Sequence, residues 1–307
     1  MYELIIIGGG PGGVAAGIYA ARKKIKTLLI TDSFGGQSLV SADIQNWVGT
    51  KSISGYDLGK ALEEHLRAQE DIEIIGDDLV TGVAKQTDGT FKITTQKGKT
   101  FDTRYLLVTS GSRRRKLGVP GEKEFDGKGV VYCSTCDAPL FKDKVTVVIG
   151  GGNAGLEAVV DLLPYASKIY LMEFGDTLKG DPLTQEKIKT NSKVEIMTMV
   201  QTLEVVGEQF VTGIKYKDRK TEETKELSVQ GVFVEIGALP NSEFLKDIVE
   251  LDKFGQVTVN HQTQQTSDAG IWAVGDVSDV LYKQNNISAG DAVKAVLNIY
   301  ERIQKES

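Results

Sequence analysis

Cysteine and histidine are scarce in this chain. Its 307 residues include two cysteines, Cys133 and Cys136, and two histidines, His65 and His261, which lie far from them in sequence. A structural zinc site needs four ligands, drawn mostly from these two residue types, so we predict no metal site. The Cys-x-x-Cys pair is then either two buried small residues or a redox pair that accepts two electrons, and we favour the redox pair.

Long apolar runs and a strong positive charge are also absent. No stretch approaches the roughly 20 apolar residues of a membrane helix, and no basic leader precedes the first predicted strand. We therefore expect a soluble, cytoplasmic protein that does not bind a membrane. The formal net charge of -6 argues against nucleic acid as a partner. One basic run, residues 113–116, is either a solvated hinge or a surface that docks an acidic partner or a phosphate.

The chain is long enough for two domains, and it contains the same motif twice. Residues 3–7 indicate a buried strand that leads into a glycine-rich turn and then a small-residue helix over 14–22. Gly8, Gly10 and Gly13 have the G-x-G-x-x-G spacing of a dinucleotide-binding turn, in which the helix N-terminus faces the pyrophosphate. A second strand over 27–31 ends at Asp32, whose carboxylate can accept hydrogen bonds from ribose.

The second copy begins with a predicted strand over 144–149. Gly150, Gly152 and Gly155 follow at the same spacing, then a helix over 156–163 and a strand over 168–172 that ends at Glu173. Two such turns predict two different nucleotides. Because a dithiol needs an intermediary to take electrons from a hydride donor, we expect a flavin in one site and a nicotinamide in the other.

Two later segments place the flavin at the first turn. A strand over 105–108 leads to Thr109-Ser110-Gly111, and a strand over 270–274 leads to Gly275 and Asp276, an acid suited to a ribityl hydroxyl. A helix of about 14 residues is expected to begin at Gly290, with its N-terminus toward the flavin ring and one apolar face against a sheet. That face comprises Val293, Val296, Leu297, Tyr300 and Ile303.

In this order the motifs make the chain resemble the low-molecular-weight thioredoxin reductases, and still more the C-terminal flavoprotein portion of the alkyl hydroperoxide reductase flavin subunit. The motifs span nearly the whole chain: Gly8 to Gly12, Phe34-Gly35-Gly36-Gln37, Asn46-Trp47, Thr109 to Gly111, Cys133 to Asp137 with Pro139-Leu140-Phe141, Gly150 to Gly155, Glu173-Phe174, Gly237 to Asn241, and Gly275-Asp276 with Tyr282-Lys283-Gln284.

The resemblance implies an α/β fold of two Rossmann-like dinucleotide-binding domains, the second inserted into the first, in a homodimer. Residues 1–113 and 243–307 would bind FAD, and residues 114–242 would bind the pyridine nucleotide and carry the dithiol. The expected FAD residues are Gly8, Gly10, Pro11, Gly13, Asp32, Gly36, Gln37, Asn46, Val83, Thr109, Gly111, Gly275, Asp276, Lys283 and Gln284. The expected nicotinamide residues are Gly150, Gly152, Asn153, Gly155 and Glu173.

The resemblance also implies roles at the dithiol. Cys136 is the thiol beside the flavin, Cys133 attacks the partner disulfide, and Asp137 protonates the leaving thiolate. A carboxyl in a partly apolar site can keep its proton near neutral pH, which agrees with that role. From the residues alone, Asp137 is equally well a helix N-cap. Ala138 departs from the family, whose members usually have glycine there.

The electron donor is predicted from a second departure. Thioredoxin reductases hold the 2′-phosphate of NADPH with basic residues after the second ribose strand, whereas this chain has Glu173-Phe174-Gly175-Asp176-Thr177-Leu178 and no arginine between Arg115 and Arg219. A carboxylate at the ribose repels a phosphate and accepts two hydroxyls, so we expect NADH rather than NADPH. Ferredoxin is the alternative donor, because some similar proteins without the basic pair do not use nicotinamides.

The sequence thus predicts a thioredoxin reductase-like flavoprotein disulfide oxidoreductase. It would transfer electrons from NADH through FAD and the Cys133/Cys136 dithiol to a thioredoxin- or glutaredoxin-like protein. The peroxide-reductase subunit has an N-terminal disulfide-carrying module, whereas here Met1 opens the first strand, so we expect a separate acceptor protein. The alternatives are a ferredoxin-dependent flavin thioredoxin reductase and a flavin and dithiol redox sensor without turnover.

Overall fold

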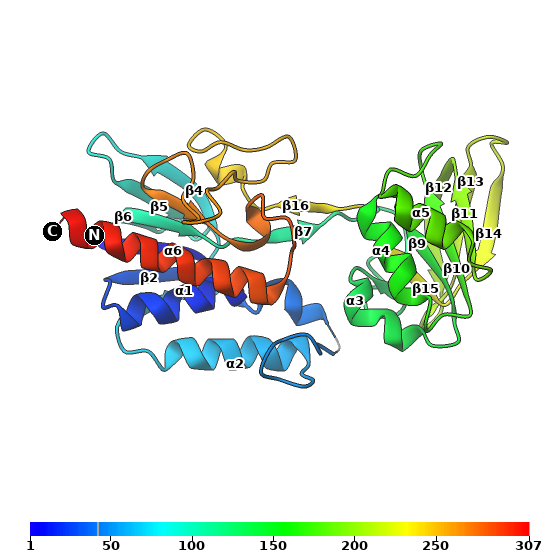
Figure 1. Ribbon diagram of the computed structural model, residues 1–307, viewed down its shortest axis with the longest axis horizontal. Coiled ribbons are helices and arrows are strands. Elements are labelled where there is room, and N and C mark those ends of the chain that lie inside the picture. Colours follow the sequence, from blue (N-terminus) through cyan, green and yellow to red (C-terminus); the bar gives the residue numbers. More distant parts are fainter. Residues whose placement is uncertain (42, 307) are drawn as a thin grey trace. The chain divides into compact units, whose positions relative to one another are not determined.

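The computed structural model describes residues 1–41 and 43–306 and divides the chain into two compact units (Figure 1). The first unit comprises Met1–Val40, Ile44–Arg113 and Leu239–Ser307, and the second comprises Ser41–Asp43 and Arg114–Ala238. The second unit is therefore inserted into the first, in agreement with the expected fold class. β7 (Ser112–Arg114) and β16 (Ala238–Pro240) pair as a two-stranded sheet where the chain passes from one unit to the other and returns.

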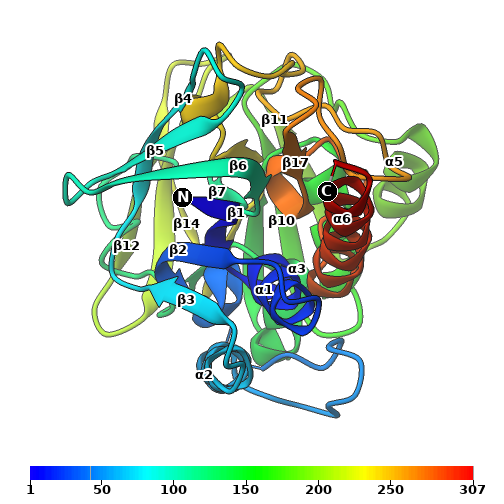
Figure 2. The ribbon, with the colours of Figure 1, turned by 90° about the vertical axis from the view of Figure 1, so that its left-hand side faces the viewer.

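The first unit is built on a sheet with the strand order β3-β2-β1-β6-β5-β4, and β17 also pairs with β6. Figure 2 shows β3, β2, β1 and β6 following one another across this sheet. The parallel strands are β1 (Tyr2–Gly9), β2 (Thr27–Phe34), β3 (Ile72–Ile75), β6 (Thr100–Val108) and β17 (Ile271–Ala273). β4 (Val80–Lys85) and β5 (Phe91–Thr95) extend it in antiparallel fashion.

Both faces of this sheet are covered, as parallel strands require. Alternate residues of β1 enter different cores: Leu4 and Ile6 belong to one apolar cluster, and Ile5 and Ile7 to another. The helices are α1 (Pro11–Arg22), α2 (Gly55–Arg67) and α6 (Asn285–Glu306), with the short 3-10 turns η1 (Gly36–Val40), η3 (Glu243–Leu245) and η4 (Gly275–Val277).

Helix α6 differs from its prediction in start and in face. It begins at Asn285 and not at Gly290, and it runs for 22 residues. Its buried side includes Ala292, Ala295, Val296, Ile299 and Ile303, while the predicted core residue Leu297 is 37% exposed. Small residues decide this rotation, because alanines of α6 and of α1 share one core cluster and let the two helices lie side by side (Figure 1).

The second unit has a parallel sheet with the order β11-β10-β9-β15-β8. Its strands are β8 (Val130–Val131), β9 (Val145–Ile149), β10 (Lys168–Glu173), β11 (Val194–Thr198) and β15 (Gly231–Val234). On one face pack α3 (Ser134–Asp137), η2 (Ala138–Phe141), α4 (Asn153–Leu162) and α5 (Pro182–Lys189). On the other face packs an antiparallel sheet of β12 (Val200–Gly207), β13 (Val211–Asp218) and β14 (Thr224–Ser228).

Within the described ranges, no helix combines the length and the apolar character that crossing a membrane requires.

Candidate active site

The first glycine turn joins β1 to α1 and has open space at its centre. Gly8 has a φ of +113°, and a β-carbon there would collide with the Thr109 carbonyl oxygen. A β-carbon on Gly13 would collide with the Gly8 carbonyl oxygen, so helix and strand pack too closely for any side chain. Gly10 is different, because no heavy atom lies within 4 Å of the position of its β-carbon. The turn therefore fits a pyrophosphate beside the α1 N-terminus.

The second glycine turn, between β9 and α4, has the same construction. Gly150 has a φ of +120° and lies against the Glu235 carbonyl oxygen, while Gly155 lies against the carbonyl oxygen of Gly150. Gly152 has no heavy atom within 4 Å of its β-carbon position. Asn153 opens α4, and its side-chain oxygen accepts a hydrogen bond from the Asp181 N–H at 2.7 Å. A second dinucleotide phosphate group thus fits the second unit.

Polar residues predicted to hold the flavin come together in the first unit. Gln37 Nε2, on η1, donates to Asp276 Oδ2, on η4, at 3.0 Å and to Ser112 Oγ at 3.0 Å. Ser112 Oγ in turn donates to Asp276 Oδ2 at 3.3 Å. Sequence reasoning missed Ser112, although it directly follows the Thr109-Ser110-Gly111 motif.

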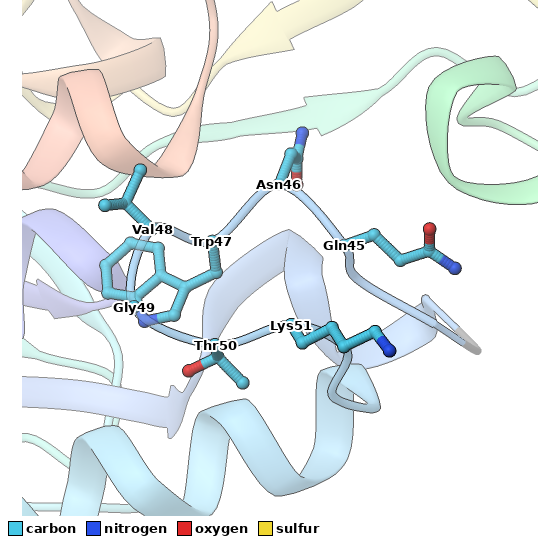
Figure 3. Close-up of a pocket in the computed structure, with 7 residues that line it drawn as sticks. All are labelled: Gln45, Asn46, Trp47, Val48, Gly49, Thr50 and Lys51. Carbon is cyan, nitrogen blue, oxygen red and sulfur yellow. The ribbon is translucent and has the colours of Figure 1, made fainter.

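Asn46 lies on a loop that borders a pocket of about 380 Å³, lined by residues 45–51. In Figure 3 the Trp47 ring lies inside the curve of this loop, whereas the Asn46 side chain points away from it. Asn46 Nδ2 donates to Gln284 Oε1 at 3.3 Å, and Asn286 Nδ2 donates to the Asn46 carbonyl oxygen at 2.7 Å. These bonds join the loop to the start of α6.

The early start of α6 brings Ser288 into the flavin site. A β-carbon on Gly12 or on Gly275 would collide with Ser288 Oγ, so the first turn of α6 packs against both glycine segments. Just before the helix, Lys283 Nζ donates to the Ser278 carbonyl oxygen at 2.5 Å, and burial lowers the pKa of Lys283. The helix signal for this turn is weak, because Asn285 and Asn286 favour turns as much as helices.

The other predicted flavin residues also lie in the first unit. Thr109 Oγ1 donates to the carbonyl oxygens of Ile7 and Gly8, at 2.8 and 3.0 Å. Asp32 lies within β2 and not after it, and its exposed carboxylate has Ser33 Oγ at 3.5 Å. Of the remaining residues, Pro11 begins α1 and Gly36 begins η1. Gly111 lies in the turn before β7, and Val83 lies on β4.

Glu173 ends β10 beside the second glycine turn. Its Oε2 accepts a hydrogen bond from the Gly151 N–H at 2.7 Å, and its Oε1 accepts one from the Gly175 N–H at 2.7 Å. The carboxylate therefore both orders the turn and places negative charge at the position expected for a ribose.

Arg219 is brought to this region by the fold, although it lies 45 residues beyond Phe174 in sequence. Its guanidinium carbon lies 3.9 Å from the centre of the Phe174 ring, and its Nη1 donates to the Phe174 carbonyl oxygen at 2.7 Å. No arginine lies near Glu173 in the sequence, but the fold places Arg219 against the segment that follows Glu173. Sequence reasoning missed this residue because it comes from the turn after β13.

Cys133 and Cys136 form a disulfide, with their Cα atoms 5.4 Å apart. Cys133 is the N-cap of α3, and both cysteines are partly exposed, so they are not two buried small residues. The hydroxyls of Ser134 and Thr135 donate to Asp161 Oδ2, on α4, at 2.9 and 3.2 Å. Among the described residues, no group of three His, Cys, Asp or Glu side chains could hold a metal ion.

Asp137 is buried on the same short helix. It is 8% exposed, and burial raises its pKa to about 6. It is the last residue of α3 and also the N-cap of η2, but its side chain makes no capping hydrogen bond there. Ala138 has an ordinary helical φ of -52° and is 2% exposed, so this position does not require glycine.

Two of the four basic residues at 113–116 are engaged in internal contacts. Arg113 forms an ion pair with Glu243 at 2.5 Å and donates to Asn241 Oδ1 at 2.8 Å. Lys116 pairs with Asp126 at 3.0 Å and lies 3.6 Å from the centre of the Tyr132 ring. The charges of Arg113 and Lys116 are thus paired with carboxylates of the same chain, which argues against this run as a docking surface for an acidic partner.

Comparison with known proteins gives one family. The family model described as pyridine nucleotide-disulphide oxidoreductase matches residues 2–295. An alkyl hydroperoxide reductase subunit of Pseudomonas aeruginosa is 41% identical over 309 residues, which cover 100% of this chain and 59% of that protein. The chain thus spans about three fifths of the length of such curated relatives.

Two solved structures cover the chain almost completely. The thioredoxin reductase from Streptococcus pyogenes has a TM-score of 0.87 with 29% identity, and that from T. acidophilum has a TM-score of 0.71 with 35% identity. In each case 99% of both chains is covered. The two Rossmann-like domains described above are the fold of these proteins.

Proposed function

The chain belongs to the pyridine nucleotide-disulphide oxidoreductase family, and we propose that it is an FAD-dependent, NADH-using disulfide reductase whose Cys133/Cys136 pair reduces a thioredoxin- or glutaredoxin-like protein. The observation that carries this proposal is the disulfide on α3, with the buried acid Asp137 one residue beyond it, in a unit that also contains a dinucleotide turn.

FAD fits the first unit. The open position at Gly10 would receive the pyrophosphate, and Asp32 would bind the adenosine ribose. Gln37, Ser112 and Asp276 form one polar cluster, and Asn46 pairs with Gln284; these two groups would bind the remainder of the cofactor. When bound, FAD supplies the conversion between hydride transfer and thiol chemistry.

The cysteine pair and Asp137 supply the disulfide exchange. In the reduced pair, the Cys133 thiolate attacks one sulfur of the partner disulfide and forms a mixed disulfide, and Cys136 then displaces the partner. Two electrons leave the pair as its own Sγ–Sγ bond re-forms, and the partner gains two electrons and two protons. Asp137, buried beside Ala138, would deliver a proton to the leaving thiolate. The assignment of Cys133 and Cys136 to their steps rests on the family resemblance.

NADH is proposed as the donor because Glu173 places a carboxylate at the second ribose. A 2′-phosphate there would meet like charge, whereas two hydroxyls would find an acceptor. Arg219 does not reverse this expectation, because its Nη1 donates a hydrogen bond to the Phe174 carbonyl oxygen and its guanidinium carbon lies 3.9 Å from the centre of the Phe174 ring. We propose that the enzyme acts as a homodimer on a thioredoxin- or glutaredoxin-like acceptor protein.

The donor is tested by anaerobic mixing of the FAD-loaded chain with NADH, NADPH or reduced ferredoxin while flavin absorbance is followed. We expect rapid bleaching with NADH. Bleaching only with ferredoxin would replace the nicotinamide proposal with the ferredoxin-dependent one. Bleaching by NADH without subsequent reduction of any thioredoxin- or glutaredoxin-like disulfide would support a redox sensor without turnover.

A further inference from the structure

One peptide group, between Phe174 and Gly175, is held by hydrogen bonds on both sides. Its carbonyl oxygen accepts a hydrogen bond from Arg219 Nη1 at 2.7 Å, and its N–H donates to Glu173 Oε1 at 2.7 Å. The other carboxylate oxygen, Glu173 Oε2, accepts one from the Gly151 N–H at 2.7 Å. A continuous series of hydrogen bonds therefore runs from the Arg219 guanidinium, through this peptide and the carboxylate, to the second glycine turn.

The backbone around Arg219 fixes the guanidinium at this peptide. β13 ends where Asp218 pairs with Val200, and one residue further on the Arg219 N–H donates to the Met199 carbonyl oxygen at 2.8 Å. The Met199 N–H in turn donates to the Gly175 carbonyl oxygen at 2.8 Å. Met199 has a φ of +59°, in the left-handed region that residues with a β-carbon seldom adopt. These bonds hold the turn after β13 against the segment that follows β10.

The Glu173 carboxylate keeps acceptor capacity for a ligand. A carboxylate has about four lone-pair sites on its two oxygens, and the two backbone N–H groups use one on each oxygen. Each oxygen can therefore accept one further hydrogen bond, which matches the two hydroxyls of a ribose. Glu173 is only partly buried, so a ligand can reach it. Rotation of the peptide between Phe174 and Gly175 would release Oε1, so the orientation of the carboxylate depends on what holds that peptide.

We propose that Arg219 is a positioning residue for the nucleotide donor: by fixing the peptide between Phe174 and Gly175, it orients Glu173 for the two hydroxyls of a ribose without a 2′-phosphate. The inference rests on the proposed function, because it concerns the nicotinamide site of the second unit. A cation near this ribose would by its charge alone favour NADPH. Arg219 instead supports the preference for NADH, because its hydrogen bond holds the residue that repels a phosphate.

The test is calorimetric titration of the FAD-loaded full chain with NAD⁺ and with NADP⁺. Neither reduces the flavin, so the measured quantity is binding and not turnover. Arg219→Met keeps an apolar stem over the Phe174 ring and removes the donor. It should weaken NAD⁺ binding by about tenfold, the effect of losing one hydrogen bond made by a charged group. NADP⁺ binding should change by less than about threefold, because a 2′-phosphate does not use the Glu173 carboxylate.

A double-mutant cycle with Glu173→Ala shows whether Arg219 acts through Glu173. In the Glu173→Ala background, which lacks the carboxylate, adding Arg219→Met should change NAD⁺ binding by less than about twofold. Arg219→Lys keeps a charged donor for the Phe174 carbonyl oxygen and should recover NAD⁺ binding to within about threefold of the wild type.

Lys220→Met is the matched control, because it removes the exposed neighbouring cation and not the donor to Phe174. It should change NAD⁺ binding by less than about twofold, since exposed charges are screened by solvent. Arg219→Gln replaces Arg219→Met if the latter does not fold, with the same results expected.

Three results would overturn the inference alone. They are an Arg219→Met protein with wild-type NAD⁺ binding, an equal loss in the Glu173→Ala background, and a loss confined to NADP⁺, which would make Arg219 a ligand of the phosphate itself. A wild type that binds no NAD⁺ would overturn the donor proposal as well, so the two failures are distinguishable.

Discussion

At the scale of single residues, Asp137 combines a functional prediction with one for stability. Burial raises the pKa of Asp137 to about 6, above that of an exposed aspartate. The neutral carboxyl therefore makes its full contribution to the stability of the folded state below the unfolded-state pKa, and this contribution is lost as the pH rises through about 6. Asp137→Asn should therefore raise the free energy of unfolding at about pH 8 by roughly 1–3 kcal/mol, at about 1.4 kcal/mol per pKa unit, with much less gain near pH 4. Denaturant unfolding at both pH values checks this.

The same substitution should slow disulfide reduction by roughly 100-fold, the lower range for loss of a general acid. Flavin reduction by NADH should be unchanged, because that step does not use the leaving thiolate. Asp143→Asn, at an exposed aspartate of the same unit, is the matched control and should alter neither quantity. An Asp137→Asn enzyme with full disulfide reductase activity would remove Asp137 from the mechanism.

Glu173 is the residue on which the choice of nucleotide depends. NADH should reduce the flavin at least about tenfold more efficiently than NADPH, because about 1.4 kcal/mol of repulsion is enough for that ratio. Glu173→Gln keeps an acceptor oxygen for the glycine turn but loses the charge, so the preference should shrink mainly through stronger NADPH binding. Stopped-flow reduction with each nucleotide measures it, with exposed Asp176→Asn as the control. Equal rates in the wild type would contradict the ribose argument.

At the scale of elements, we expect substitutions in the two glycine turns to impair two different cofactors separately. Gly10 and Gly152 are the N-caps of α1 and α4 with extended backbones, and both have open space at the β-carbon position. Gly10→Val and Gly152→Val should therefore fold, but each side chain would occupy the space of a pyrophosphate. Gly10→Val should lose FAD. Gly152→Val should keep FAD and lose reduction by NADH by at least about tenfold, corresponding to about 1.4 kcal/mol. FAD content and NADH titration measure the two losses, and each variant controls for the other.

The same elements show what the sequence could predict. Strand, glycines and helix lie in local order, so both turns and their central strands were predictable from residue type and spacing. The start of α6 was not, because Ser288 is held there by packing against Gly12 and Gly275, which lie elsewhere in the sequence. Arg219 escaped notice for a related reason: it reaches its site from the turn after β13, whose neighbours in space are far away in the chain.

At the scale of the whole molecule, the chain combines two units that each contain a glycine turn with a single cysteine pair. The insertion of the second unit into the first is what the family resemblance implies, and the chain has the fold of the two thioredoxin reductases that cover it. The central claim is that reducing equivalents from NADH reach Cys133 and Cys136, since every other role depends on this transfer.

The most direct measurement is the number of free thiols per chain before and after anaerobic addition of NADH to the FAD-loaded protein. The account predicts two new thiols per chain, located by alkylation and peptide mapping at Cys133 and Cys136, which form the disulfide. Cys133→Ser and Cys136→Ser, which cannot form this disulfide, should gain none. Full reduction of the flavin by NADH with no new thiol at either cysteine would contradict the account.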